Sequence, residues 1–134
     1  MGKRFVIVLD TCILLYEALE TRRLSAKALR AIRAAESANE LCCCDISLWE
    51  IAMLTEAGRL KLDVAVAPFI EAALALRGVR VLPISAEIAA LSNRLGLHKD
   101  PADRLIAATA VNRGARLVTS DEKLLNADAV PTIW

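Results

Sequence analysis

Four acidic residues stand where an ionised side chain is costly unless it serves a purpose. Asp10 directly follows one short apolar run, and Asp121 comes shortly after the end of another. Asp103 and Glu50 lie on helix patterns whose inward positions are otherwise apolar, with neighbours at helical spacing that include Ile106, Ala107 and Ala110 for the first and Ile46, Met53, Leu54 and Ala57 for the second. A buried carboxylate is strongly disfavoured unless it is paired or bound to a metal. These four acids are therefore candidate functional residues.

If the acids meet in one place, their mutual repulsion must be relieved. Two carboxylates about 4 Å apart repel by ~4 kcal/mol at an effective dielectric of ~20. This repulsion is a large fraction of the free energy of unfolding of a small domain. The remedies are raised pKa values or a bound cation. Oxygen ligands without histidine or cysteine indicate Mg²⁺ or Mn²⁺. Such ions activate water and stabilise the charge of a phosphodiester during its hydrolysis.

Each acid also has a purely structural explanation. Asp10 and Asp121 suit turns or helix N-caps, and Glu50 could form a buried salt bridge. Asp103 could bond back toward the start of its helix, for which Asp100 is predicted to be the N-cap. The residue types alone leave both explanations open, so the elements that position the acids must be considered next.

The elements around the acids alternate as in an α/β protein. Short apolar runs predict strands at residues 5–9, 41–44, 79–82, 117–118 and 131–134. Helix patterns with caps and closing glycines, Gly114 among them, occupy residues 12–19, 25–37, 45–57, 63–76, 85–95, 100–113 and 123–126. Such alternation predicts parallel strands joined by right-handed crossovers. The carboxyl ends of parallel strands share one edge, where these sheets place ligands, so the acids are expected to converge there.

Three local features qualify this assignment. Residues 59–62 alternate charged and apolar side chains, which predicts an extended segment, and Pro68 is expected to kink or split the helix at 63–76. Residues 42–44 are consecutive cysteines, too close together for a disulfide framework or a metal site. They lie in an apolar run, so we interpret them as part of a buried strand.

The composition limits the class of protein. A chain of 134 residues fits a single domain, and 56% hydrophobic with 25% charged residues indicates a globular fold. The formal net charge of +1 provides no overall basic field for nucleic acid, although a local basic patch remains compatible with it. The first apolar run stops at Asp10, too early for a secretion signal, and no stretch is long enough to span a membrane. With cysteines that have no evident pairing, we expect a cytoplasmic location.

The motifs around the four acids match a known family. They are LDTC around Asp10, DISLWEIAML around Glu50, HKDPADRLIAATA around Asp103 and LVTSD at Asp121, with PTIW at the end of the chain. The sequence resembles PIN-domain ribonucleases, most closely the VapC-like toxins of bacterial and archaeal toxin–antitoxin pairs. Each motif alone is weak, but four in this order and spacing are specific, and the resemblance covers the whole chain.

The resemblance implies a three-layer α/β/α sandwich with a five-stranded parallel sheet. It also implies hydrolysis of RNA that depends on Mg²⁺ or Mn²⁺, in which a metal-bound water attacks phosphorus and the product carries a 5′-phosphate. The residues implied as metal-binding and catalytic are Asp10, Glu50, Asp103 and Asp121. Thr119 matches the small polar residue before the last acid, and Thr11 and Ser120 are further supporting candidates. Cys12 departs from the pattern, because many relatives carry Ser or Asn there.

The resemblance further implies partners. Relatives are usually homodimers and are neutralised by a cognate antitoxin, whose peptide lies in a groove near the active site. The long apolar helices within residues 10–76 suit such a groove, with core packing as an equal alternative. Arg104, Lys99 and His98 are candidates for RNA contact because they lie beside the third acid in the chain. Arg104 could instead pair with a nearby acid, and His98 could be a plain surface residue.

Other functions fit the sequence less well. A Mg²⁺-dependent phosphatase or phosphotransferase on a similar sheet needs a second aspartate two residues after the strand-end one, where this chain has Cys12. A non-catalytic phospho-acceptor domain needs an acidic pair before the end of the first strand, where this chain has Val8-Leu9. A pure interaction module has no reason to bury Glu50 and Asp103 together. Incubation with RNA, with and without Mg²⁺, separates these classes.

Overall fold

The computed structural model describes residues 6–97 and 99–134, within which five strands form one parallel sheet in the order β3-β2-β1-β4-β5. The strands are β1 (Ile7–Leu9), β2 (Leu41–Cys44), β3 (Arg80–Leu82), β4 (Arg116–Val118) and β5 (Thr132–Ile133). Val8 of the central strand pairs with Cys42 on one side and Leu117 on the other. The order of the strands reverses between β1 and β4, which is the switch point where open α/β sheets bind ligands.

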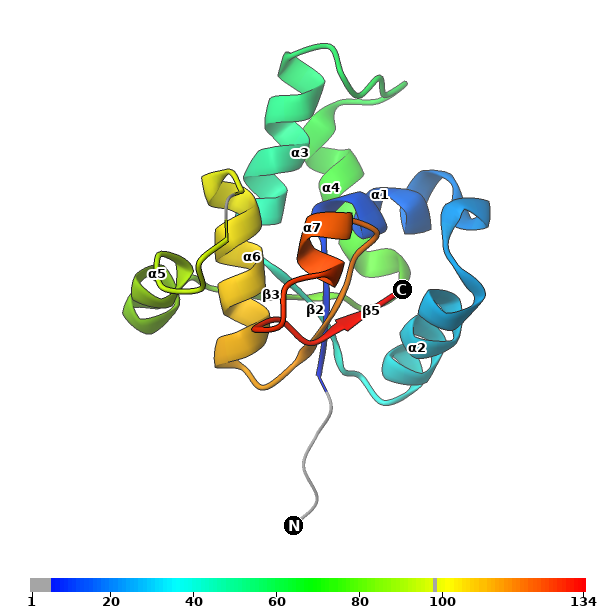
Figure 1. The fold of residues 1–134 in the computed structure, drawn as a ribbon. Coiled ribbons are helices and arrows are strands. Elements are labelled where there is room, and N and C mark those ends of the chain that lie inside the picture. Colours follow the sequence, from blue (N-terminus) through cyan, green and yellow to red (C-terminus); the bar gives the residue numbers. More distant parts are fainter. Residues whose placement is uncertain (1–5, 98) are drawn as a thin grey trace.

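Helices cover both faces of the sheet, so the predicted three-layer architecture is confirmed (Figure 1). Ile7 and Leu9 face α1 (Thr11–Leu19), α2 (Ala26–Ser37) and α4 (Val66–Leu76), whereas Val8 faces α6 (Pro101–Asn112) and α7 (Glu122–Leu125). This division follows from the alternation of side chains along a strand. The remaining helix of the second layer, α5 (Ala86–Ser92), packs on α6. The cysteines of β2 are buried, as predicted.

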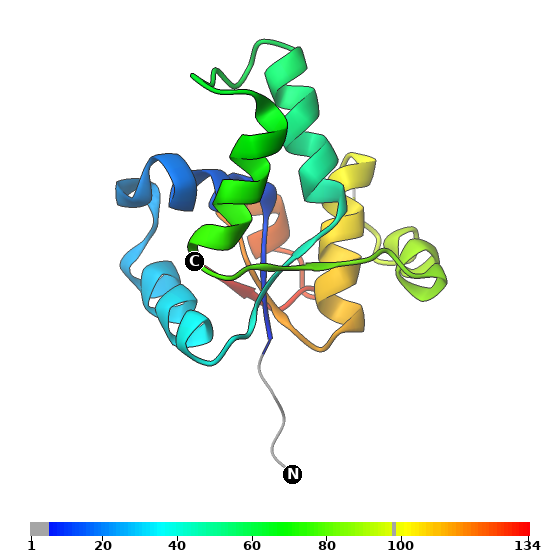
Figure 2. The same ribbon diagram turned by 180° about the vertical axis from the view of Figure 1, so that it is seen from behind.

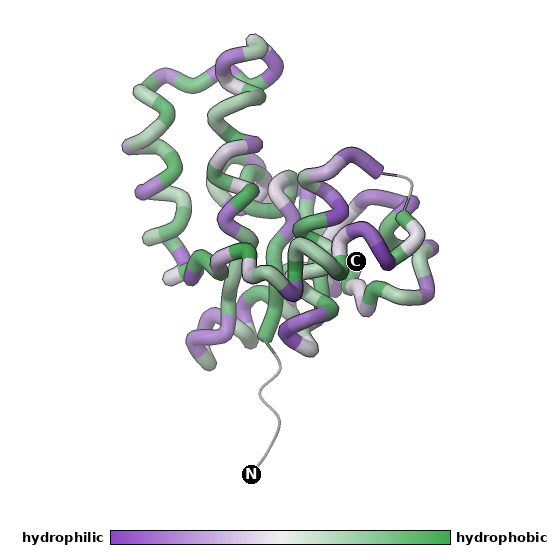
Figure 3. Tube along the Cα trace, turned by 90° about the vertical axis from the view of Figure 1, so that its left-hand side faces the viewer, coloured by the Kyte–Doolittle hydropathy of each residue, from purple (hydrophilic) through white to green (hydrophobic). Residues whose placement is uncertain are grey.

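A helical hairpin projects from one end of the molecule. It consists of α3 (Ile46–Glu56), which contacts α1, α4 and α6, and of α4, which returns toward the sheet (Figures 1 and 2). Hydrophobic positions continue along both of its helices (Figure 3). No residue of α4 is fully buried. Because α3 starts directly after β2, it holds its side chains just beyond the carboxyl edge of the sheet.

Capping residues set the helix boundaries near that edge. Asp10, Asp100 and Asp121 are the N-caps of α1, α6 and α7, and each accepts a hydrogen bond from a backbone N–H at the start of its helix. Gly114 follows α6 with φ of +62°, the left-handed conformation that ends a helix and favours glycine. The predicted boundaries of α6 are therefore confirmed.

Several local predictions differ from the structure. Residues 59–62, predicted to be extended, begin with a bend at residues 59–60, and the helix predicted from residue 63 begins at Val66. Pro68 neither kinks nor splits α4, because it lies in the first turn, where a backbone N–H has no partner within the helix. The last helix spans Glu122–Leu125 rather than 123–126 because Asp121 caps it. Phe5, the predicted start of the first strand, lies outside the described residues, and Val6 precedes β1.

None of the described helices combines the length and apolar character that crossing a bilayer requires.

The chain also contains a short 3₁₀ turn, η1 (Thr21–Arg23), between α1 and α2. Its last residue, Arg23, lies with its guanidinium 4.3 Å from the centre of the Tyr16 ring, which anchors the turn to α1 by a cation–π contact.

Candidate active site

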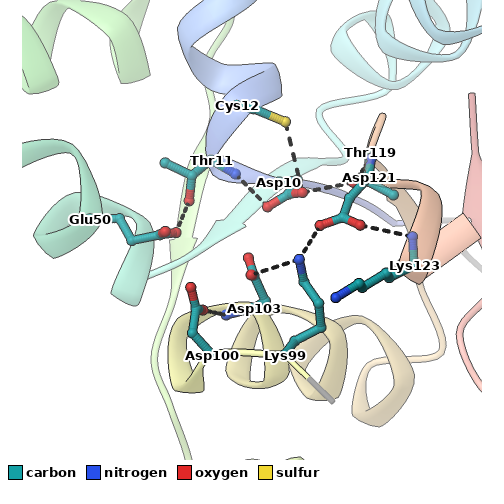
Figure 4. A network of polar contacts seen from close by, with 10 residues as sticks. All are labelled: Asp10, Thr11, Cys12, Glu50, Lys99, Asp100, Asp103, Thr119, Asp121 and Lys123. Carbon is teal, nitrogen blue, oxygen red and sulfur yellow. Dashed lines mark hydrogen bonds and ion pairs between the residues drawn. The ribbon is translucent and has the colours of Figure 1, made fainter. Parts of the chain in front are cut away.

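The four candidate acids line one cavity at the carboxyl edge of the sheet. The cavity has a volume of about 320 Å³ and is lined by Asp10, Thr11, Cys12, Leu15, Glu50, Leu54, Asp103, Ser120 and Asp121. The acids come from the end of β1, from α3, from the first turn of α6 and from the segment after β4. Figure 4 shows their carboxylates directed toward one another. The predicted convergence is therefore present in the structure.

Asp10 is held at the inner end of this group by several hydrogen bonds. Its Oδ1 accepts from the Thr11 amide at 2.8 Å, and its Oδ2 accepts from the Thr119 hydroxyl at 2.7 Å. Cys12 Sγ lies 3.8 Å from the same Oδ2. Burial raises the pKa of Asp10, and these hydrogen bonds only partly oppose it. A buried carboxylate with fixed oxygens is a site that a cation would stabilise.

Thr11 connects Glu50 to the end of β1. The Thr11 hydroxyl donates to Glu50 Oε1 at 2.5 Å and lies 2.9 Å from the hydroxyl of Ser47, which is buried in α3. Burial raises the pKa of Glu50, the bond from Thr11 lowers it, and the charge of Asp10 raises it further. The two threonines, Thr11 and Thr119, were predicted as supporting residues, and both orient an acid. Ser47 was not predicted, since a serine in a helix start gives no such indication.

Lys99 bridges two of the acids. Its Nζ lies 2.5 Å from Asp121 Oδ2 and 3.4 Å from Asp103 Oδ2. The sequence had suggested Lys99 only as a contact for RNA, although its i, i+4 spacing to Asp103 was a sign of an ion pair. The bond to Asp121 raises the pKa of Lys99, so this side chain remains charged.

The two acids that Lys99 contacts differ in acidity. Burial raises the pKa of Asp103 to about 7, with the charges of Asp10 and Asp100 adding to the effect. Burial also acts on Asp121, but hydrogen bonds from Lys99 and from the Lys123 amide outweigh it and leave the pKa of Asp121 lowered. Asp121 Oδ1 accepts the Lys123 N–H at 2.9 Å as the cap of α7. Asp121 is therefore both the N-cap of α7 and one of the acids that line the cavity.

The other predicted site residues lie as follows. Thr119 is fully buried and its hydroxyl also accepts the Asp121 amide at 3.0 Å, whereas Ser120 lines the cavity. Arg104 donates to Asn93 at 3.2 Å and does not line the cavity, so the alternative in which it pairs with an acid is not found among the described residues. His98 lies outside the described residues.

The chemistry of this donor set suits a hard divalent cation. All four acids offer oxygen, and within the described residues Lys99 is the cation that forms ion pairs with them, so negative charge is in excess. Within residues 6–97 and 99–134, no three acid, histidine or cysteine side chains are arranged closely enough to hold an ion as they stand. The oxygens instead accept hydrogen bonds from Thr11, Thr119 and Lys99. Metal binding at this site therefore requires side-chain movement but no change of residue types.

Solved structures share this fold. A chain in the crystal structure of VapBC2 from Rickettsia felis bound to a DNA fragment from their promoter aligns with a TM-score of 0.72 at 19% identity, covering 96% of this chain and 97% of that one. A chain of FitAcB from Neisseria gonorrhoeae aligns with a TM-score of 0.63 at 21% identity, covering 95% and 96%. At these identities the similarity establishes the fold alone.

Sequence comparison defines the family. The chain is 38% identical over 120 residues to Ribonuclease VapC22 from Mycobacterium tuberculosis, and the aligned region covers 88% of each protein. Residues 7–130 match the model of the PIN domain. This span contains all four acids of the cavity and every strand but β5. The chain belongs to the PIN-domain family.

Proposed function

We propose that this protein is a metal-dependent endoribonuclease that hydrolyses RNA phosphodiester bonds and acts as the toxin of a toxin–antitoxin pair. The observation that carries the proposal is the cavity in which Asp10, Glu50, Asp103 and Asp121 meet. The 38% identity to Ribonuclease VapC22 supports RNA as the substrate. The cytoplasm, where RNA is present, is the location that agrees with the four free cysteines among the described residues.

The four acids would hold Mg²⁺ or Mn²⁺. A bound ion would supply activation of water and stabilisation of the charge that develops on the phosphodiester. The threonines prepare its site, because Thr119 fixes one oxygen of Asp10 and Thr11 fixes one oxygen of Glu50. Burial raises the pKa of Asp103 to about 7 in the metal-free protein, so a bound cation would also stabilise the charged form of this acid. Ser120 adds a hydroxyl at the wall of the cavity.

Of the two described basic residues proposed to contact RNA, Lys99 and Arg104, Lys99 lies nearer to the acids. Its ammonium is beside the cavity and would face a phosphate of a substrate that reaches the acids. Arg104 is directed instead at Asn93 on the side of α5. Substrate binding would therefore depend more on Lys99 than on Arg104.

An antitoxin partner and a homodimer belong to the same proposal. A second cavity of about 390 Å³ shares Glu50 with the acidic one and is otherwise lined mainly by apolar groups, including Trp49, Met53 and Leu105. Trp49 is 57% exposed, and α4 has no fully buried residue. The protein's own core therefore leaves much of the α3–α4 hairpin uncovered. This favours the alternative in which these apolar helices form a groove for an antitoxin peptide. The structural neighbours include toxin–antitoxin complexes.

Cleavage of RNA tests the enzymatic part. Purified protein is incubated with single-stranded and structured RNA in Mg²⁺, in Mn²⁺ and in EDTA, beside the variant Asp10→Asn. We expect cleavage only with metal and only by the wild type, with 5′-phosphate ends. Cleavage that persists in EDTA or in the variant would contradict the proposal.

Co-expression tests the biological part. The protein should arrest growth of a bacterial host, and the small protein encoded next to its gene should restore growth and co-purify with it. Size-exclusion chromatography with light scattering reports the mass of the isolated chain. Growth that is unaffected by the active ribonuclease would contradict the role as a toxin while leaving the activity standing.

A further inference from the structure

A cation already lies among the acids of the cavity. Lys99 contacts Asp121 at 2.5 Å and Asp103 at 3.4 Å, and its side chain is only 18% exposed. Its backbone directly precedes Asp100, the N-cap of α6, so the base of the side chain is positioned by a capped helix. From there it reaches across to the segment after β4 (Figure 4). The ammonium thus joins two acids that belong to different elements.

The place that the ammonium takes is the place that a metal ion needs. A divalent ion held by Asp103 and Asp121 would need an oxygen from each carboxylate. Asp121 Oδ1 already accepts the Lys123 amide N–H and Oδ2 contacts Lys99, so an ion at Oδ2 would take the place of the ammonium. Two cations so close together repel each other strongly in a partly buried site. Metal binding and the present position of Lys99 therefore exclude each other.

We propose that Lys99 is a built-in counter-ion that competes with the divalent metal for Asp103 and Asp121 and is displaced when the metal binds. This inference rests on the proposed metal-dependent function. It means that the metal-free protein keeps its acids together without an ion. It also means that the affinity for metal is lower than the four carboxylates alone would give.

Calorimetric titration with Mn²⁺ alone, without RNA, tests the competition. Lys99→Met keeps a long unbranched side chain but removes the charge, and Lys99→Arg retains it. We expect Lys99→Met to bind Mn²⁺ about tenfold more tightly than the wild type, a typical size for coupling between two ligands. Lys99→Arg should bind no more tightly than the wild type. The control is Lys27→Met, an equal change of charge at an exposed position of α2.

A second measurement uses the unaltered protein. Chemical acetylation of lysines, followed by mass spectrometry, reports how free each ammonium is. We expect Mn²⁺ to increase the modification of Lys99 at least several-fold, because the metal releases it from Asp121, while modification of Lys27 stays constant. This result does not depend on whether a variant folds.

The outcomes separate this inference from the proposed function. If the wild type binds Mn²⁺ but Lys99→Met binds it equally or more weakly, or if acetylation of Lys99 does not respond to the metal, the competition is refuted and the metal site stands. If neither the wild type nor Lys99→Met binds Mn²⁺, the proposed metal site is refuted and the inference with it.

Discussion

The protein groups carboxylates in two places and balances their charge differently. Away from the cavity, Arg77 at the end of α4 donates to Glu17 at 3.1 Å and to Glu36 at 3.3 Å. At the carboxyl edge of the sheet, four acids line one cavity, and within the described residues Lys99 is the cation that pairs with two of them, Asp103 and Asp121. In the Arg77 cluster both acids thus have a cationic partner, whereas in the cavity two of the four acids have one.

Burial alone does not distinguish these clusters. The side chain of Glu17 is 5% exposed and that of Asp103 is 17% exposed, so the acid of the Arg77 cluster is the more deeply buried one. The difference lies in the excess negative charge and in the space beside it. The Arg77 cluster ties α1, α2 and α4 together, whereas the other cluster leaves its charge facing a cavity. A functional site is marked by charge that the fold itself does not neutralise.

The largest expected effect comes from removing one charge of the acidic cavity. Asp10→Asn should lower the rate of RNA cleavage by about a thousandfold or more, because losing a metal ligand raises the barrier by several kcal/mol and each ~1.4 kcal/mol is a factor of ten. Without metal, the variant should melt at a higher temperature, since burial disfavours the charged form of Asp10. Single-turnover cleavage and thermal melting in EDTA measure the two effects. Equal cleavage by both proteins, after contaminating nuclease is removed, would reject this site.

The opposite result is expected at the Arg77 cluster. Arg77→Met should lower the free energy of unfolding by about 2–3 kcal/mol, because it leaves the buried carboxylate of Glu17 without its cation. Cleavage per folded molecule should not change. Urea denaturation and the cleavage assay measure these quantities. The double variant Glu17→Gln with Arg77→Met should recover part of the loss, and if it is no more stable than Arg77→Met alone, the unpaired charge is not the cause.

The acidic cavity should also make the stability of the metal-free protein depend on pH. Burial raises the pKa of Asp103 to about 7, so between pH ~4 and ~7 the folded state keeps a proton that the unfolded state has lost. The free energy of unfolding therefore falls as the pH rises through this window. Asp10 and Glu50, whose pKa values burial also raises, act in the same direction, whereas the lowered pKa of Asp121 affects stability only below about pH 4, outside this window.

Urea denaturation in EDTA at pH 5 and at pH 7.5 measures this dependence. Asp103→Asn should remove about 1–2 kcal/mol of the difference, a figure that allows for the partial exposure of the side chain. Arg77→Met, which lies outside the cavity, serves as the control and should lower stability without flattening this fall. If wild type and Asp103→Asn show the same slope, Asp103 does not titrate in this window.

The smallest effect is expected where a hydroxyl only orients an acid. Thr11→Val should lower the free energy of unfolding by about 1 kcal/mol, since Ser47 and Glu50 lose a partner. Cleavage should fall several-fold at saturating metal. Thr11→Ser keeps the hydroxyl and should retain most of the activity. If the serine and valine variants lose the same activity, the methyl contact rather than the hydrogen bond positions Glu50.

Local patterns in the chain were enough to predict most of the helices and strands and the edge of the sheet at which the acids meet. The buried run before Asp10, the cap at Asp100 and the closing Gly114 are local signs, each effective within one or two turns of chain. Parallel strands then force their carboxyl ends to one side, so the meeting of the four acids followed without knowledge of any contact. The start of α4 was missed because Ala65, its N-cap, gives no capping hydrogen bond that a sequence could reveal.

Which groups donate hydrogen bonds to the acids or pair with their charges depends on how distant elements pack together. Thr119 and Asp10 are 109 positions apart in the chain, and their bond exists because β1 and β4 lie side by side with Leu9 opposite Val118. Lys99 could have faced solvent or RNA, but the packing of α6 beside the end of β4 brings Asp121 within its reach. A long side chain can reach several partners at a similar cost in conformational entropy. Which partner it contacts therefore depends on how whole elements pack together rather than on the local sequence pattern.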